Sequence, residues 1–267
     1  MKLTVLCDNN SRIDAYYLAE PGVSYLLECD GKRVLFDTGY SDVYLRNAQA
    51  LGINLTDIDA IAISHGHIDH TGGLPYFPHT AQKVPLYGCP GIFTPKRDED
   101  GDNGAPITYE EAARRFDLRL NSQPTAITEH LWHLGQIPRV TDFECKRPFG
   151  ECWEQGIWQP DMMLDDSALV YQGNGGLTII TACSHSGICN IVEHAKRLFH
   201  EERIAGIIGG FHMLKMTSRV EKTVAYLEKQ HIAKLCPCHC TNFYARAAIH
   251  KVIPIEDICV ADISEFE

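Results

Sequence analysis

The stretch Ser64-His65-Gly66-His67-Ile68-Asp69-His70 places four side chains that can bind metal ions within six residues. It follows Asp59-Ala60-Ile61-Ala62-Ile63, an apolar run that predicts a buried strand. Imidazole suits zinc, iron and similar cations, and a carboxylate adds charge. We expect the first two histidines to hold one metal ion, while the aspartate and the last histidine turn towards a second. Two such ions can activate a water molecule and bind a substrate oxygen.

The composition excludes several other classes of protein. The chain has 267 residues and a formal net charge of −11, whereas nucleic-acid binding requires clustered Lys and Arg side chains. The N-terminus lacks a signal peptide's features, and no run approaches the roughly 20 apolar residues of a membrane span. The eleven scattered cysteines indicate reduced thiols. We expect a cytoplasmic protein with a small-molecule substrate and no nucleic-acid or membrane partner; the sequence does not predict its oligomeric state.

The first third of the chain alternates short apolar segments with turns. Strands are expected at Lys2–Leu6, Ser24–Glu28 and Arg33–Phe36, and Cys29-Asp30-Gly31-Lys32 is typical of a hairpin turn. A helix is expected at Asp42–Leu51, where apolar residues recur on one face.

The middle of the chain, Cys89–Asp166, is rich in Gly, Pro and charge. It contains one expected helix, Tyr109–Leu120, in which Glu110/Arg114 and Glu111/Arg115 have the i,i+4 spacing of ion pairs. Too little of the segment is periodic and apolar for a separate core. We interpret 89–166 as a cap-like insertion within a single domain spanning residues 1–267.

The last hundred residues repeat a strand–helix alternation three times. Strands are expected at Leu177–Thr181, Ile204–Ile208 and Ala233–Leu235, with a capping box at Ser218 and Glu221 before the second helix. One histidine follows each strand, and these are His185, His212 and His239. The ends of parallel strands meet at one edge of a sheet, so the three histidines can converge on one site.

Ser64–Leu74 resembles the signature of the metallo-β-lactamase superfamily, and Phe36-Asp37-Thr38-Gly39 resembles its upstream aspartate turn. Further segments resemble its dihydropteroate-synthase-like branch, which in archaea includes the enzyme joining a dihydropterin to ribofuranosylaminobenzene phosphate. Those segments are Cys7–Asn9, Gly135–Arg139, Asp165–Leu169, Thr181–Ile188, Gly209–His212 and Cys238–Thr241. Ala182, Asn242 and Pro21–Ser24 depart from the pattern of that branch. The resemblance implies an α/β fold, a four-layer αββα sandwich with the cap-like segment inserted.

The resemblance also implies a set of site residues. Metal ligation is expected from His65, His67, Asp69, His70 and His185, and catalytic roles from Asp69 and His212. His239 and His212 are alternatives for the closing ligand, with His212 otherwise a proton donor. Asp37 is expected to orient a ligand histidine through its other ring nitrogen. Many relatives bridge the metals with an aspartate on the strand that here carries Cys183-Ser184-His185, so the bridge is either absent or supplied by Asp165 or Asp166.

Three functions are compatible with this pattern. The first is a metal-dependent hydrolase with two divalent ions, expected to be zinc with manganese or iron as alternatives. It would act on an ester, phosphoester or pyrophosphate-like bond of a small phosphorylated aromatic or heterocyclic substrate. The second is a transferase that forms a carbon–nitrogen bond and releases pyrophosphate, as in the archaeal relatives. The third is a non-catalytic metal sensor or an iron-based redox protein.

Side chains of the middle segment are candidates for substrate binding. Arg139, Lys146 and Arg147 are candidates for the phosphate, and Trp132, Trp153 and Trp158 for the ring. Cys236-Pro237-Cys238-His239-Cys240 lacks the common Cys-x-x-Cys spacing, so we interpret its cysteines as small buried residues at a strand end.

Overall fold

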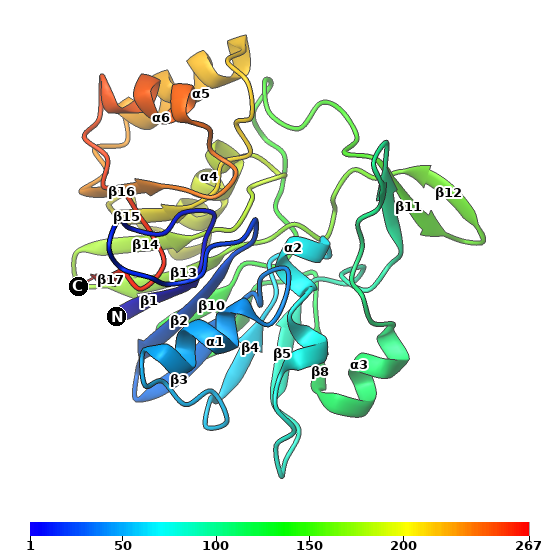
Figure 1. The fold of residues 1–267 in the computed structure, drawn as a ribbon. Coiled ribbons are helices and arrows are strands. Elements are labelled where there is room, and N and C mark those ends of the chain that lie inside the picture. The colour runs from blue at the N-terminus through cyan, green and yellow to red at the C-terminus, as the bar shows by residue number, and fades with distance from the viewer. Residues whose placement is uncertain (267) are drawn as a thin grey trace.

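A computed structural model describes residues 1–266 and shows two large β-sheets packed face to face, with helices outside each (Figure 1). The seven-stranded sheet has the order β17 (Ile263–Glu265), β1 (Lys2–Cys7), β2 (Ser24–Cys29), β3 (Lys32–Phe36), β4 (Ala60–Ala62), β5 (Pro85–Gly88), β8 (Asp117–Leu120). The six-stranded sheet has the order β16 (Lys234–Pro237), β15 (Ile204–Gly209), β14 (Gly176–Ile180), β13 (Leu169–Gly173), β10 (Leu131–His133), β9 (Thr125–Ala126).

The remaining elements are a small sheet and the helices. The small sheet has the order β12 (Ile157–Pro160), β11 (Glu151–Glu154), β6 (Lys96–Asp98), β7 (Gly101–Asp102). The helices are α1 (Val43–Ala50), α2 (Ile68–Thr71), α3 (Tyr109–Arg115), α4 (Ile188–Phe199), α5 (Ser218–Glu228) and α6 (Phe243–His250), with a 3-10 turn at Leu74–Tyr76.

Three apolar clusters separate four layers. One lies between helices α4–α6 and the six-stranded sheet and includes Ile207. The second lies between the two sheets and includes Phe36 and Ile208. The third lies between α1 and the seven-stranded sheet and includes Leu35. Successive residues of a strand point to opposite faces, so each sheet contributes to two clusters. The fold is therefore α/β, and its layers have the αββα order that the resemblance implies.

Most of the expected elements are present. The strands of the first third and the last hundred residues lie within one or two residues of their predicted limits, and α1 lies inside Asp42–Leu51. Asp30 and Gly31 have φ of 54° and 67°, and Cys29 pairs with Lys32 across the predicted hairpin turn. Two positive φ values in a row are the signature of a type I′ turn.

Two helix predictions were wrong in detail. The helix expected at Tyr109–Leu120 ends at Arg115, and Asp117–Leu120 form β8, in which exposed and half-buried residues alternate. Instead of pairing with Glu111, Arg115 donates to two backbone carbonyls, and Glu111 completes a capping box with Thr108. The capping box predicted at Ser218 is absent, because α5 begins after Thr217 without a side-chain cap.

The segment that we predicted as a cap contributes strands to all three sheets. Strands β8, β9 and β10 extend the two large sheets, whereas β6, β7, β11 and β12 pair only with one another among the described residues. A buried ion network ties the small sheet to the histidine loop: the Lys96 ammonium lies 2.6 Å from Asp161 Oδ2 and 3.0 Å from Asp165 Oδ1. The other oxygen of Asp165 accepts a hydrogen bond of 2.8 Å from the Gly66 amide.

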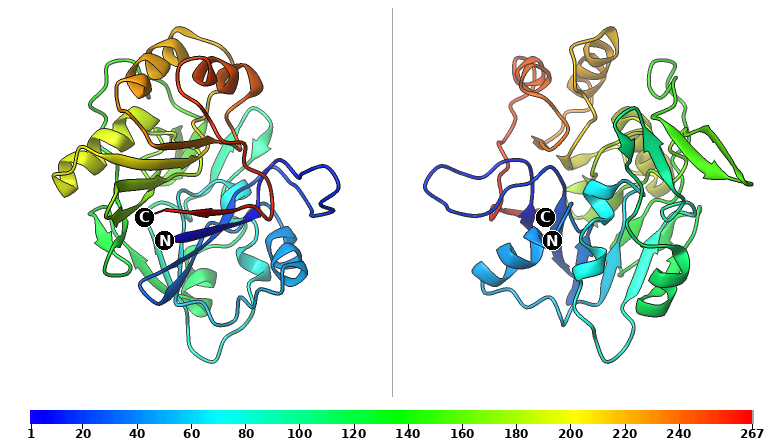
Figure 2. Two further views of the ribbon diagram at one scale, coloured as in Figure 1. Left: turned by 90° about the vertical axis from the view of Figure 1, so that its left-hand side faces the viewer. Right: turned by 45° about the vertical axis from the view of Figure 1, so that its right-hand side comes forward.

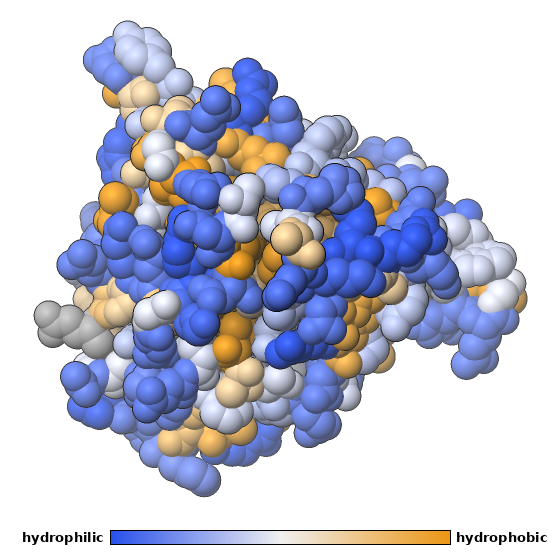
Figure 3. All heavy atoms as spheres, turned by 90° about the horizontal axis from the view of Figure 1, so that it is seen from below, coloured by the Kyte–Doolittle hydropathy of each residue, from blue (hydrophilic) through white to orange (hydrophobic). Residues whose placement is uncertain are grey.

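The two ends of the described chain lie side by side (Figure 2), where the N-terminal amine donates to the Phe266 carbonyl. The loop after β1 extends from the body of the molecule, and its Arg12 pairs with Asp262. Seen from below, the surface is mostly hydrophilic with small apolar patches (Figure 3). None of the helices within residues 1–266 combines the length and apolar character that crossing a bilayer requires.

Replacing Lys96 by methionine is expected to lower the free energy of unfolding by about 3–5 kcal/mol, because two buried carboxylates lose their cation. Urea denaturation measures the change. Lys32→Met is the control, since its pair with Asp59 is exposed and contributes about 0–1 kcal/mol. Equal effects of the two substitutions would contradict the assignment of Lys96 as the centre of a buried network.

Candidate metal centre

Strand ends from both large sheets bring the predicted site residues together. β4 leads directly into Ser64–His67, and the single turn of α2 carries Asp69 and His70. On the other sheet, β14, β15 and β16 are parallel, so the residues that follow them lie at the same sheet edge. The site thus lies where the two sheets meet.

The backbone at these strand ends adopts an uncommon conformation. Asp37, Ser184, His212 and His239 have φ of 57°, 57°, 46° and 48°, in the left-handed region that non-glycine residues rarely occupy. Each costs of order 1–3 kcal/mol, which the surrounding structure must offset. At Gly209, φ is 128° and a Cβ would lie 1.9 Å from the Thr181 carbonyl oxygen, so only glycine fits. Such strain gathers at functional sites more often than elsewhere.

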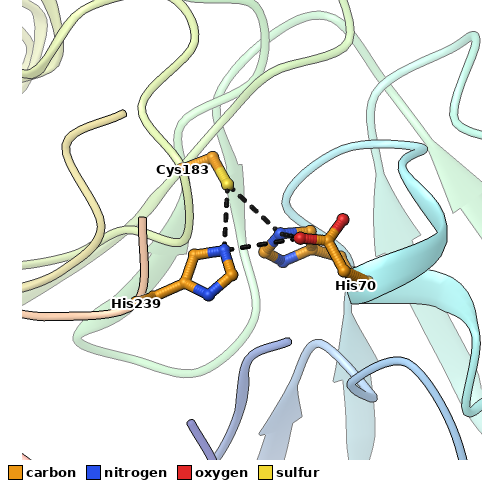
Figure 4. A group of neighbouring side chains, drawn as sticks. His70, Cys183 and His239 are labelled. Carbon is orange, nitrogen blue, oxygen red and sulfur yellow. Dashed lines mark hydrogen bonds and ion pairs between the residues drawn. The ribbon is translucent and has the colours of Figure 1, made fainter. Parts of the chain in front are cut away.

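Two groups of donor atoms are formed, and within each group all of the donor atoms lie within 4.8 Å of one another. The three-histidine group consists of His65, His67 and His185, with His65 Nε2 and His67 Nδ1 3.1 Å apart. The second group consists of Asp69, His70, Cys183 and His239 (Figure 4). Asp69 Oδ2 lies 3.3 Å from His70 Nε2 and 3.4 Å from His239 Nε2. Between the alternatives for the closing position, His239 is therefore the one beside Asp69.

His212 lies next to these groups and not inside them. Its ring is centred 4.4 Å from that of His185, and it belongs to a third group with Cys183 and Cys240. Its amide donates to Cys240 Sγ over 3.2 Å. Sequence reasoning selected neither cysteine as a donor: Cys240 was interpreted as a small buried residue, and the signal for Cys183 was its place on the strand where many relatives carry an aspartate.

Unpaired nitrogen atoms test whether these residues fit metal ions. His67 Nε2, both ring nitrogens of His185 and His212 Nδ1 are buried and have no hydrogen-bond partner within the part of the chain that the structure describes. An unpartnered buried polar atom is costly, so several together indicate a missing partner. Facing imidazole nitrogens with carboxylate and thiol donors are what zinc and similar cations bind. The residues fit a metal centre.

Burial and neighbouring charges shift the pKa values of these histidines in two directions. Burial lowers the pKa of His65 and His185 well below the usual value, and that of His67 to about 4. These rings are neutral at physiological pH, the form that binds metals. Burial also acts on His70, but the carboxylates of Asp69 and Asp37 outweigh it and raise its pKa to about 10. A ring held between two carboxylates marks a position that attracts a cation.

Three of these imidazole rings, those of His70, His65 and His239, have a polar partner at Nδ1. Asp37 Oδ2 lies 2.8 Å from His70 Nδ1, the contact that its predicted orienting role requires. Ser64 Oγ donates to the same carboxylate and lies 2.9 Å from His65 Nδ1. On the other sheet, His239 Nδ1 lies 2.7 Å from Asn9 Oδ1.

The carboxylates considered as a bridge are engaged elsewhere. Asp165 binds Lys96 and the Gly66 amide, and Asp166 accepts bonds from the amides of His185 and Ser186. Within residues 1–266, neither belongs to a clustered donor group. Both support the backbone of the site.

The donor groups open into a cavity of about 530 Å³. Phe149 forms part of its apolar wall, and the Phe149 ring is centred 4.6 Å from the ring of His185 and 5.1 Å from that of His212. Within the described chain, no lysine or arginine lines the cavity.

The candidates proposed for phosphate and ring binding are not in this lining. Arg139 donates to the carbonyls of Met162 and Met163. Trp132 packs on Phe199, and Trp153 packs on Trp158. Cys238 Sγ contacts Tyr25 Oη, away from the cavity, whereas Cys240 lines it.

Known proteins match the chain almost from end to end. A family model of the metallo-beta-lactamase superfamily matches residues 18–138. The chain is 29% identical to the 7,8-dihydropterin-6-methyl-4-(β-D-ribofuranosyl)-aminobenzene-5′-phosphate synthase of Methanocaldococcus jannaschii, over 92% of its own length and 89% of the relative's. It is 31% identical to an uncharacterized protein of that organism, over 94% of each chain.

A solved structure gives the same result. The crystal structure of Tm1679, described as a metal-dependent hydrolase of the β-lactamase superfamily, superposes with a TM-score of 0.87 at 32% identity, covering 99% of this chain and 98% of that one. Relatives above 30% identity thus match nearly the whole chain, and the expected αββα layers are present. The chain belongs to the metallo-β-lactamase superfamily and is an enzyme of that superfamily.

Proposed function

We propose that the chain is a two-metal hydrolase that acts on an ester, phosphoester or pyrophosphate-like bond of a small phosphorylated aromatic or heterocyclic substrate. The observation that carries this proposal is the pair of adjoining donor groups, with unpaired buried imidazole nitrogens, at one cavity. The similarity to a metal-dependent hydrolase over 99% of the chain supports it.

In this proposal, His65, His67 and His185 hold one ion, and Asp69, His70 and His239 hold the other. When bound, two zinc ions would supply Lewis-acid charge to a substrate oxygen and lower the pKa of a water molecule. The cavity lining offers no ammonium or guanidinium group within residues 1–266, so the centre itself is the source of positive charge for a phosphate.

Side chains around the donor groups orient the ligand rings, supply a proton donor and cover part of the cavity. Asp37 and Asn9 each accept a hydrogen bond from the outer nitrogen of a ring, which fixes the ring's orientation and its tautomer. His212 projects into the cavity with an unpaired Nδ1 and can give a proton to the leaving group. Phe149 covers the rings of His185 and His212 and keeps water from that side.

A second candidate function is formation of a carbon–nitrogen bond between a pterin and an aminobenzene compound, with release of pyrophosphate. The specific observation in its favour is the 29% identity to the archaeal synthase over 92% of the chain. Here the positive charge of the centre would hold the pyrophosphate that leaves.

The two functions predict different requirements for substrate. Protein reconstituted with two equivalents of zinc is expected to hydrolyse bis(p-nitrophenyl) phosphate with no acceptor present, and a chelator is expected to abolish the activity until zinc is returned. Release of nitrophenolate measures the rate. Strict dependence of any turnover on an aminobenzene acceptor would establish the second function in place of the first.

Replacing Asp37 by asparagine is expected to weaken metal binding by about 10–100-fold, because His70 loses the carboxylate that orients it. Competition with a chromophoric chelator measures the affinity. Asp30→Asn is a matched control, since Asp30 Oδ1 also binds a histidine Nδ1, that of His130, over 2.9 Å at the surface. Unchanged metal affinity in the Asp37 variant would contradict the orienting role.

Replacing His212 by glutamine is expected to lower kcat on the phosphodiester by about 10²–10⁴-fold, the usual contribution of a general acid. Metal content, measured by mass spectrometry, is expected to stay at two equivalents. The exposed variant His130→Gln serves as the control. Loss of one equivalent in the His212 variant would instead show that His212 is a ligand.

A further inference from the structure

The lining of the metal cavity has an apolar part beside its donor groups. Apart from the cysteines, the apolar residues of this lining in the described chain are Pro21, Phe149 and Leu214. Phe149 precedes β11, and Leu214 lies between β15 and α5. The tryptophans that the sequence suggested for a substrate ring are not in the lining, so a ring held in the cavity meets these residues instead.

Leu214 is an exposed side chain on a firmly held backbone. The residue is 56% exposed, whereas its neighbour Met213 is buried. The Met213 amide donates to the Cys240 carbonyl over 3.0 Å, and the Met213 carbonyl accepts from the Asn242 amide over 3.1 Å. Such a mount fixes a large apolar side chain on the cavity wall and lowers the entropic cost of binding a ligand there.

The side chain of Asn242 joins the Leu214 segment to helix α6. Its Nδ2 donates to the Leu214 carbonyl over 2.6 Å, and its Oδ1 accepts from the Ala245 amide over 2.8 Å as the N-cap of α6. Asn242 is one of the residues that depart from the pattern of the dihydropteroate-synthase-like branch. The tether of Leu214 is therefore not implied by that resemblance.

The apolar part of the lining adjoins the donor groups. Phe149 contacts the rings of His185 and His212, and Leu214 follows His212 by two residues. A phosphate held by the metal centre thus has its organic substituent near apolar side chains. Small-molecule sites commonly combine such apolar walls with a few polar groups that fix orientation.

We propose that Phe149 and Leu214 form the surface that binds the aromatic or heterocyclic ring of the substrate, and that Asn242 is a positioning residue that holds Leu214 in place. This inference rests on the proposed function, in which the metal centre binds the phosphate. An aryl group removes more apolar surface from water than a methyl group does, so this surface selects aryl over alkyl phosphates.

Two phosphonates test the selection, because hydrolysis of the proposed kind does not cleave their carbon–phosphorus bond. Isothermal titration calorimetry of the zinc-loaded protein is expected to show phenylphosphonate binding at least about tenfold more tightly than methylphosphonate. Leu214→Ser is expected to lower this ratio at least about threefold and to leave the affinity for methylphosphonate unchanged. Met216→Ser is the matched control, since Met216 is 46% exposed on the same segment and lies outside the lining.

Asn242→Ser separates the tether from the helix cap. Serine also caps helices, but its short hydroxyl does not reach the Leu214 carbonyl. The variant is expected to lower the phenyl-to-methyl ratio as Leu214→Ser does, with an unchanged Tm. A purely structural role of Asn242 would instead lower the Tm and leave the ratio as in the wild type.

Three results would overturn the proposal: equal affinities of the wild type for the two phosphonates, an unchanged ratio in Leu214→Ser, or a change of oligomeric state in that variant by light scattering. The last would assign Leu214 to a subunit interface. Turnover of bis(p-nitrophenyl) phosphate is measured on the same protein. Phenyl preference without hydrolysis would support the ring surface and reject the hydrolase function, and hydrolysis without phenyl preference would do the reverse.

Discussion

The arrangement of the site depends on one buried carboxylate. Asp37 follows β3 in a left-handed conformation, and its two oxygens accept the Ser64 amide at 2.7 Å, the Ser64 hydroxyl at 2.6 Å and a nitrogen of His70 at 2.8 Å. It thereby joins the turn after β3, the loop after β4 and helix α2. Because these bonds lie within the protein, the rings are oriented before any cation arrives, and little ordering entropy remains to oppose binding.

The sequence alone predicted those parts of the fold and of the site that depend on a local pattern of residues. The apolar run before His65 and the histidine after each of three late strands predicted both the strands and the edge at which their ends meet. Each depends only on neighbouring residues and on the rule that parallel strands end at one edge. The extra donor Cys183 was missed because free cysteines are among the most buried residues, so its type alone does not distinguish packing from ligation.

Features set by distant contacts could not be predicted in this way. The charge pattern around Arg115 suits a helix, yet Asp117–Leu120 pair with β5 and form a strand. The tryptophans and Arg139 looked available for a substrate, but the fold packs or bonds them elsewhere. Phe149 lies in a charged, irregular segment, and only the folded chain brings it to the cavity.

The origin of the donors in two sheets has a consequence for how the protein is made. Synthesis proceeds from the N-terminus, so His65, His67, Asp69 and His70 emerge from the ribosome long before Cys183 and His185. His239 is the last of the clustered histidines to be made. An early fragment has donors from one sheet alone, and neither donor group is complete. Both donor groups can therefore be filled only after synthesis has passed His239 and the two sheets have come together.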